Sequence, residues 1–221
     1  MTHHSVNDDC IIVQVTKAST RTERRKAELR QDIIDTAFAC FAEKGYHATG
    51  IADIAVELGI GHGTFYRYFS NKRDIIDHVI DDLSARIIGA LGTENAPDAA
   101  TTLDEYRDQI DRIGVALTRI LLEDRRVAQL LLFHATGIDD ELTARLYGLL
   151  DTADTLTAGY LEHGVDLGYL RQDLDTLNTA RAVTGMLLAG VVHGLRDPDE
   201  AAIAALSEAI RRLLVDGVRK D

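Results

Sequence analysis

The amino-acid sequence predicts an all-α protein with an N-terminal three-helix domain, a helix-turn-helix within it, and a larger helical domain behind it. Only two prolines occur among 221 residues, which leaves long stretches without a helix breaker. Apolar residues recur at intervals of three and four along most of the chain, and this periodicity predicts about nine helices in total. Hydrophobic residues make up 46% and charged residues 27%, which excludes a chain that is disordered throughout.

The first helix is predicted to begin at Thr20, because Thr20 and Glu23 have the spacing of a capping box. Residues 1–19 before it lack periodicity and are expected to form a flexible polar tail. The helix continues to Gly45, and one apolar face runs along it. This face consists of Leu29, Ile33, Ile34, Ala37, Phe38 and Phe41.

Two short helices follow and complete an N-terminal domain of residues 20–70. Thr49 is suited to cap the second helix, whose apolar face ends at Leu58. Gly59 comes next, in the position of a left-handed C-cap. Residues 62–69 are long enough for two further turns. Two short helices joined at a glycine turn form a candidate helix-turn-helix.

Longer amphipathic segments define a second domain of residues 71–221. Ser70 is suited to cap a fourth helix, which ends near Leu91, and Pro97 lies in the loop after it. The last helix is expected to open at Asp197, with Pro198 in its first turn. The helices between are predicted over residues 103–121, 127–135, 139–167 and 175–195.

Cysteine use and hydropathy indicate the compartment. Cys10 and Cys40 are the only cysteines, and they have no C-x-x-C spacing that would suggest zinc or redox chemistry. No apolar run approaches the about 20 residues of a membrane span. We therefore expect a cytoplasmic protein with no membrane association, no metal and no cofactor.

The charge is unevenly distributed, so the net charge of −12 does not exclude a nucleic-acid partner. Residues 17–74 carry ten Lys and Arg against eight Asp and Glu, whereas residues 75–221 have a net charge of −12. Lys72 and Arg73 lie in the first turn of a predicted helix, where cations oppose the helix dipole. Their position is explained if this helix end faces a phosphate, and the alternative is that both are simply solvated.

The spacing of residues around the glycine turn resembles the N-terminal DNA-binding domain of the TetR family of bacterial transcriptional regulators. The resemblance covers about residues 25–75. It rests on Gly45-Tyr46-x-Ala48-Thr49-x-Ile51-x-x-Ile54-Ala55-x-x-Leu58-Gly59-Ile60-x-x-Gly63-Thr64-Phe65-Tyr66-x-Tyr68-Phe69-x-x-Lys72. The chain departs from the family at three positions. Gly50 and Gly61 stand where the family often has Ser or Thr, and Arg73 stands where it often has Glu.

The resemblance implies that the third helix enters the major groove of DNA. Thr49, Tyr66 and Lys72 would then contact phosphates. Gly61 and Gly63 would let the backbone approach a strand closely. The further contact positions are His62, Thr64, Arg67 and Tyr68.

The resemblance also implies a homodimer on a palindromic operator, since helix-turn-helix dimers commonly read two half-sites. The last two helices would form the dimer interface, and the alternative is that they are buried within one subunit's own core. The interface residues expected are Gly185, Ala189, Gly190, Ile203, Leu206, Ile210 and Leu213.

A ligand site is expected among the middle helices, where aromatic or polar-tipped residues lie among Leu and Ile. Because most surroundings are aliphatic, we expect an apolar or amphipathic small-molecule effector. The candidate residues are Tyr106, Phe133, His134, Tyr147 and Tyr160.

These features together predict a ligand-responsive DNA-binding repressor that is not an enzyme. The sequence has no G-x-S-x-G, H-E-x-x-H or P-loop motif, and Gly59-x-Gly61-x-Gly63 lacks the preceding strand of a dinucleotide site. The alternatives are a helical protein-interaction module without DNA binding and a small helical enzyme.

Overall fold

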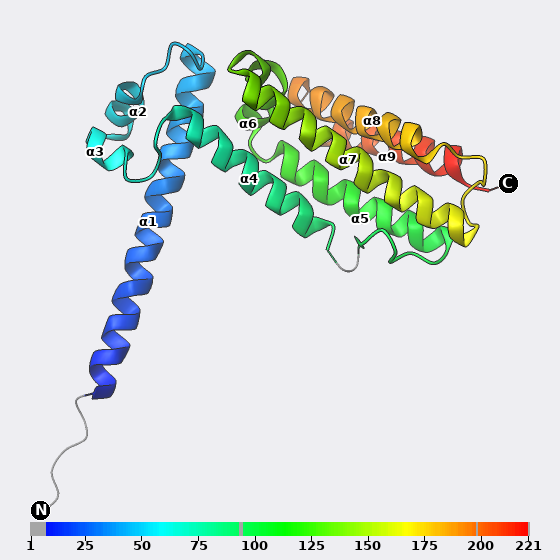
Figure 1. Cartoon of the computed structure of the whole chain (residues 1–221), viewed down its shortest axis with the longest axis horizontal. Helices are drawn as coiled ribbons and strands as arrows, with labels where there is room; N and C mark the ends of the chain where they lie inside the picture. The colour runs from blue at the N-terminus through cyan, green and yellow to red at the C-terminus, as the bar shows by residue number, and fades with distance from the viewer. Residues whose placement is uncertain (1–7, 93–94, 198, 221) are drawn as a thin grey trace, which may run out of the picture. The chain divides into compact units, whose positions relative to one another are not determined.

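The computed structural model describes residues 8–92, 95–197 and 199–220, with the backbone alone for residues 8–20 (Figure 1). The described chain contains nine α-helices and no strand beyond one isolated bridge, so the predicted all-α class is confirmed. The helices are α1 (Asp8–Lys44), α2 (Ile51–Leu58), α3 (His62–Phe65), α4 (Lys72–Ala90), α5 (Leu103–Leu122), α6 (Arg125–Gln129), α7 (Asp140–Leu167), α8 (Thr176–Arg196) and α9 (Glu200–Val218). A π-helical turn (Leu130–His134) and a 3₁₀ turn (Ala135–Gly137) follow α6, where the sequence predicts one helix.

The chain forms two compact units, residues 1–79 and 80–221. Helix α4 begins in the first unit and continues into the second. This division falls after the boundary at residue 70 that the sequence suggests. The physical reason is that the first turns of α4 belong to the N-terminal core, in which Ile75 and Ile76 are fully buried.

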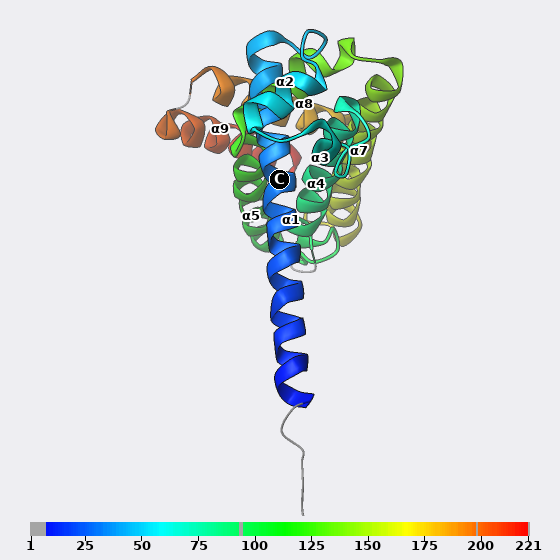
Figure 2. The ribbon, with the colours of Figure 1, turned by 90° about the vertical axis from the view of Figure 1, so that its left-hand side faces the viewer.

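Helix α1 begins at Asp8 and not at Thr20, so residues 8–19 are helical and the expected tail is wrong for this segment. Figure 2 shows α1 as one uninterrupted helix. Residues 8–19 contain neither Pro nor Gly to stop it, and Asp8 and Asp9 complement the dipole at its start. The remainder of the expected tail, residues 1–7, lies outside the described residues.

Two further helix starts differ from the predictions because a nearby side chain caps better. Asn71, and not Ser70, accepts the amide proton of Asp74 at 2.9 Å, and the Asp74 carboxylate accepts the Ser70 amide at 2.8 Å. The capping side chain is therefore one residue further along the chain than predicted, and the Asp74 carboxylate adds a bond to the residue before it. In α9 the cap is Asp199, which accepts the amide of the third helical residue, and not Asp197.

Aromatic and branched side chains from all four helices form the core of the first unit, as the apolar spacing predicts. Phe38 and Phe41 meet edge to face, with ring centroids 5.8 Å apart. The buried side chains of this core are Ile33, Ile34, Ala37, Phe38, Phe41, Ile54, Ala55, Phe65, Phe69, Ile75 and Ile76.

The second unit contains the long helices α5, α7, α8 and α9, together with α6 and the end of α4. The chain after α7 closes one end of its core. Leu170 is fully buried there, and it pairs with Arg219 in the isolated bridge. Gly164 lies against the Leu170 side chain. A Cβ atom added at Gly164 would lie only 2.5 Å from the Leu170 Cδ1 atom. Within the described ranges, no helix has the length and hydropathy needed to cross a membrane.

Replacing Gly164 with Ala should lower the free energy of unfolding by about 1–3 kcal/mol, because the added methyl group overpacks the Leu170 contact. The matched control is Gly148→Ala in the same helix. A Cβ atom there meets nothing within 4 Å, so helix propensity should raise stability by up to about 1 kcal/mol. Urea unfolding measures both variants, and equal gains in stability would contradict the close packing at Gly164.

Candidate nucleic-acid interface and ligand cavity

The turn between α2 and α3 is set by Gly59. Its φ angle is 69°, in the left-handed region that favours glycine, which confirms the predicted C-cap. The next amide, of Ile60, reaches back 2.9 Å to the carbonyl of Ala55 and closes the end of α2. Helix α3 then starts at His62, so the glycine turn fixes the direction in which α3 leaves α2.

The segment from Gly61 to Phe69 has one buried side and one exposed side, which fixes what it presents. Phe65 and Phe69 are buried and anchor it, with ring centroids 6.1 Å apart. On the other side, 56% of Tyr66 is exposed. The further exposed residues are Gly61, His62, Gly63 and Arg67, with Thr64 and Tyr68 partly buried. The structure thus brings together seven of the predicted DNA-contact positions; we call residues 61–68 the reading segment.

The two glycines of the reading segment have no packing role within the chain. A Cβ atom at Gly61 or Gly63 would meet nothing within 4 Å, and neither residue has a positive φ angle. Space above the backbone is therefore open to another molecule. This geometry is what close approach to a DNA strand requires.

Lys72 is held within the protein by hydrogen bonds to backbone carbonyls, which gives it a structural role that the sequence does not predict. Its Nζ atom donates to the carbonyl oxygens of Tyr46 at 2.6 Å, Thr49 at 2.9 Å and His47 at 3.4 Å. The same atom lies 4.3 Å from the centroid of the Tyr46 ring. Burial lowers the pKa of the Lys72 ammonium from its usual value. Because an ammonium group has three protons to donate, all of its hydrogen bonds in the described structure are directed at this turn, and its contact with a phosphate stays a prediction.

The side chain of Thr49 likewise has a structural position, and its predicted contact with a phosphate is not tested by the structure. Only 1% of the residue is exposed, and its hydroxyl lies within hydrogen-bonding distance of the carbonyls of Gly45 at 2.8 Å and Cys40 at 3.2 Å. Nor does Thr49 cap α2, because Gly50 is the N-cap. The Gly50 amide donates to the Asp53 carboxylate at 2.7 Å. Thr49 therefore ties the turn to α1.

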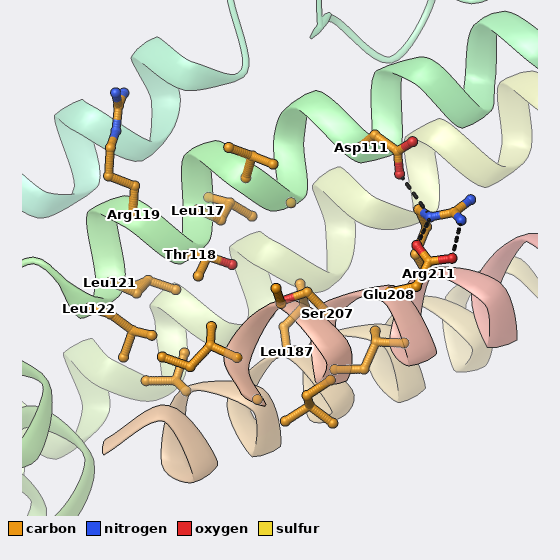
Figure 3. Close-up of a pocket in the computed structure, with 18 of the residues that line it drawn as sticks. Asp111, Leu117, Thr118, Arg119, Leu121, Leu122, Leu187, Ser207, Glu208 and Arg211 are labelled. Carbon is orange, nitrogen blue, oxygen red and sulfur yellow. Dashed lines mark hydrogen bonds and ion pairs between the residues drawn. The ribbon is translucent and has the colours of Figure 1, made fainter. Parts of the chain in front are cut away.

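A cavity of about 930 Å³ lies between α5, α8 and α9 in the second unit (Figure 3). Asp111, Glu208 and Arg211 form an ionic group at its rim, with an Asp111–Arg211 distance of 3.1 Å. Hydrogen bonds from Arg211 and Arg212 lower the pKa of Glu208 to about 2. Aliphatic side chains cover much of the wall, among them Ile110, Leu117, Leu121, Leu122, Leu187, Val191 and Leu214.

None of the predicted ligand residues lines this cavity. Tyr106 is buried against Tyr169 with ring centroids 5.8 Å apart, and the Tyr160 hydroxyl donates to the Asn95 carbonyl at 2.5 Å. The others are exposed, namely Phe133, His134 and Tyr147. The prediction followed aromatic residues, whereas aliphatic side chains dominate the cavity wall. The apolar stripes of α5 and α9 were the sequence feature from which the cavity wall could have been predicted.

Several of the predicted dimer residues line the cavity. Gly190 faces Ile210, whose Cδ1 atom would lie 3.4 Å from an added Cβ. Gly190 and Ile210, with Ile203 and Leu206, line the cavity within one chain. All four are partly buried in the single chain, and their place in a dimer interface stays a prediction. Residues that remain on the outside are Gly185, Ala189 and Leu213.

Comparison with known proteins supports the interpretation of the first unit. Residues 33–79 match the family model described as bacterial regulatory proteins, tetR family. The chain is 24% identical to the fatty acid metabolism regulator protein of Bacillus subtilis, over 88% of this chain and 98% of that protein. It is 35% identical over 114 residues to an HTH-type transcriptional repressor of Mycobacterium tuberculosis, covering 49% of this chain and 57% of that protein.

A solved structure shares the fold over nearly the whole chain. The transcriptional regulator FadR from Bacillus subtilis, in complex with stearoyl-CoA, superposes with a TM-score of 0.68. The alignment covers 86% of this chain and 99% of that chain at 24% identity. The helical order of both units is therefore that of known regulators.

Replacing Lys72 with Met should lower the free energy of unfolding by about 1–3 kcal/mol, because partly buried carbonyl groups lose their donor. The control is Lys44→Met, which removes an exposed pair with Asp53 at 3.8 Å and should cost at most about 1 kcal/mol. Urea unfolding distinguishes the two. If the Lys72 variant kept its stability but lost DNA affinity, the main role of Lys72 would be a contact with a DNA phosphate.

Proposed function

Because this chain belongs to the TetR family of bacterial transcriptional regulators, we propose that it is a homodimeric repressor that an amphipathic small molecule releases from a palindromic operator. The observation that carries the proposal is the reading segment. Buried Phe65 and Phe69 anchor it, and it presents an exposed backbone and exposed polar side chains. Its named relatives are transcriptional regulators and not enzymes.

The reading segment would divide its contacts between bases and phosphates. Thr64 and Arg67 are candidates for base edges, since an arginine can donate two hydrogen bonds to guanine. Tyr66 and Tyr68 have hydroxyl groups suited to phosphate oxygens. Open space at Gly63 supports a close approach of the strand. Lys72 contributes by holding the preceding turn in place.

The second unit supports dimerisation through the outer faces of α8 and α9. Small side chains are exposed on both helices, so two copies can approach closely. On α8 these residues are Ala182, Gly185 and Ala189, and on α9 they are Ala202, Ala205 and Ala209. Leu213 adds an exposed apolar side chain, 66% accessible, to the α9 face. A two-fold dimer built here would match two operator half-sites.

The cavity supports an effector with a long apolar part and a polar end. Its volume of about 930 Å³ lies near the upper end of common ligand pockets, and an aliphatic wall meets an ionic group at the rim. Stearoyl-CoA, which the FadR structure contains, has this amphipathic character. We therefore take long-chain acyl compounds as the first effector class to test.

Release would require that the effector bind better to a conformation with low operator affinity. A tenfold loss of operator affinity corresponds to a coupling free energy of about 1.4 kcal/mol, and DNA must weaken effector binding tenfold in return. Helix α4 is the proposed connection. It continues into the second unit, and its first residue, Lys72, is bonded to the turn before α2.

Replacing Arg67 with Ala should weaken binding to a site that the wild-type protein selects from a random DNA library. The expected loss is about 5- to 150-fold, from a lost guanine contact of about 1–3 kcal/mol. Binding to an unrelated duplex should change much less, and the distant control Arg196→Ala should change neither. Equal losses on both duplexes would assign Arg67 to phosphate, and failure of the wild type to select any site would overturn the repressor proposal.

Replacing Gly114 with Leu should weaken stearoyl-CoA binding, because Gly114 lines the cavity and the new side chain occupies part of it. The matched control is Gly148→Leu in α7, outside the cavity. At both glycines an added Cβ meets nothing within 4 Å. Both variants should gain helix stability of up to about 1 kcal/mol. Calorimetric titration that finds equal binding to Gly114→Leu and wild type would locate the effector elsewhere.

A further inference from the structure

Helix α1 carries a basic segment before it enters the core of the first unit. Residues 21–30 contain five Lys and Arg against two Glu, in a chain whose net charge is −12. Residues 21–28 are all exposed, and the first buried residue of the described helix is Ile33. We call residues 21–30 the basic arm. Packing within the chain does not explain its length or its charge.

One face of the basic arm continues the side on which α1 packs in its core. Lys26 and Arg30 are spaced by four residues, and Ile34, a further four along, is buried. The Arg30 guanidinium lies 5.2 Å from the centroid of the Phe69 ring. Phe69 directly follows the reading segment. This contact places Arg30, at the end of the basic arm, beside the residue that directly follows the reading segment.

Internal ion pairs do not account for these cations. Arg24 meets Glu28 at 3.3 Å, but both side chains are more than half exposed, so this pair contributes little stability. Within the described ranges, Arg21, Arg25 and Lys26 have no carboxylate partner at ion-pair distance. Like charges four residues apart, such as Arg21 and Arg25, slightly destabilise a helix. The arrangement therefore costs some stability in the isolated protein, a cost that a bound polyanion would offset.

We propose that the basic arm binds backbone phosphates of the DNA that flanks the site contacted by the reading segment. This inference rests on the proposed DNA-binding function. Ten helical residues rise about 15 Å. B-DNA carries one phosphate charge for about every 1.7 Å of its axis, so several phosphates lie within the span of the arm. Such contacts raise affinity on every sequence and add no base discrimination.

The test compares the double variant Arg25→Gln/Lys26→Gln with the control Arg196→Gln/Lys220→Gln, which removes two exposed cations of the second unit. Each protein is titrated at several salt concentrations. The probes are a duplex selected from a random library by the wild type, the same duplex trimmed of its flanks, and an unrelated duplex. Glutamine keeps helix propensity, and circular dichroism verifies that each variant is folded.

The arm variant should reduce the slope of log K against log salt concentration by about 1–2 per protomer, as expected for one or two lost phosphate contacts. The loss should be equal on selected and unrelated duplexes and should disappear on the trimmed duplex, while the control matches the wild type. An unchanged slope and affinity, in a protein whose wild type binds its selected site, would overturn the inference alone. No binding by the wild type would overturn the proposed function first. Lost binding to anionic phosphatidylglycerol vesicles, with DNA affinity unchanged, would assign the arm to a membrane surface.

Discussion

The ammonium group of Lys72 is the contact on which the geometry of the first unit depends. Lys72 opens α4, yet its donors reach the carbonyls of Tyr46 and Thr49 in the turn that leads into α2. This turn has no helical partners for those oxygens, so a cation at this position satisfies them. One side chain therefore joins the end of α1, the start of α2 and the start of α4. The orientation of the reading segment follows from that junction.

Burial and exposure then divide the reading segment into a support and a contact surface. Phe65 and Phe69 lie in the core, so the residues between them are fixed without using their own polar groups. Tyr66 and Arg67 remain available to solvent or to a partner. The Arg30 guanidinium of α1 lies 5.2 Å from the centroid of the Phe69 ring, next to this segment. An acidic protein can in this way present a locally cationic side to DNA, because charge acts over about 10 Å at ordinary salt concentrations.

The second unit combines two uses of apolar helices that sequence periodicity does not separate. One apolar stripe of α9 consists of Ile203, Leu206 and Ile210. Such a stripe indicates only that this face of the helix is removed from solvent. In the folded chain these residues, together with α5 and α8, surround a cavity. The outer side of α9 carries alanines instead. Whether an apolar face meets a neighbour, a partner chain or a ligand depends on which helix lies opposite, and this is a property of packing.

The sequence by itself determined the helical class, the glycine turn after α2 and the position of the reading segment. These features depend on local spacing, since caps, left-handed glycines and apolar periodicity act within a few residues. The tertiary structure alone decided the contacts of Lys72 and Thr49 and the position of the cavity. Lys72 and Tyr46 are 26 residues apart along the chain but hydrogen-bonded in space. A lysine in the first turn of a helix can donate to distant backbone carbonyls or bind a phosphate. The sequence is the same in both cases, and only the position of the folded backbone shows which carbonyls lie within reach.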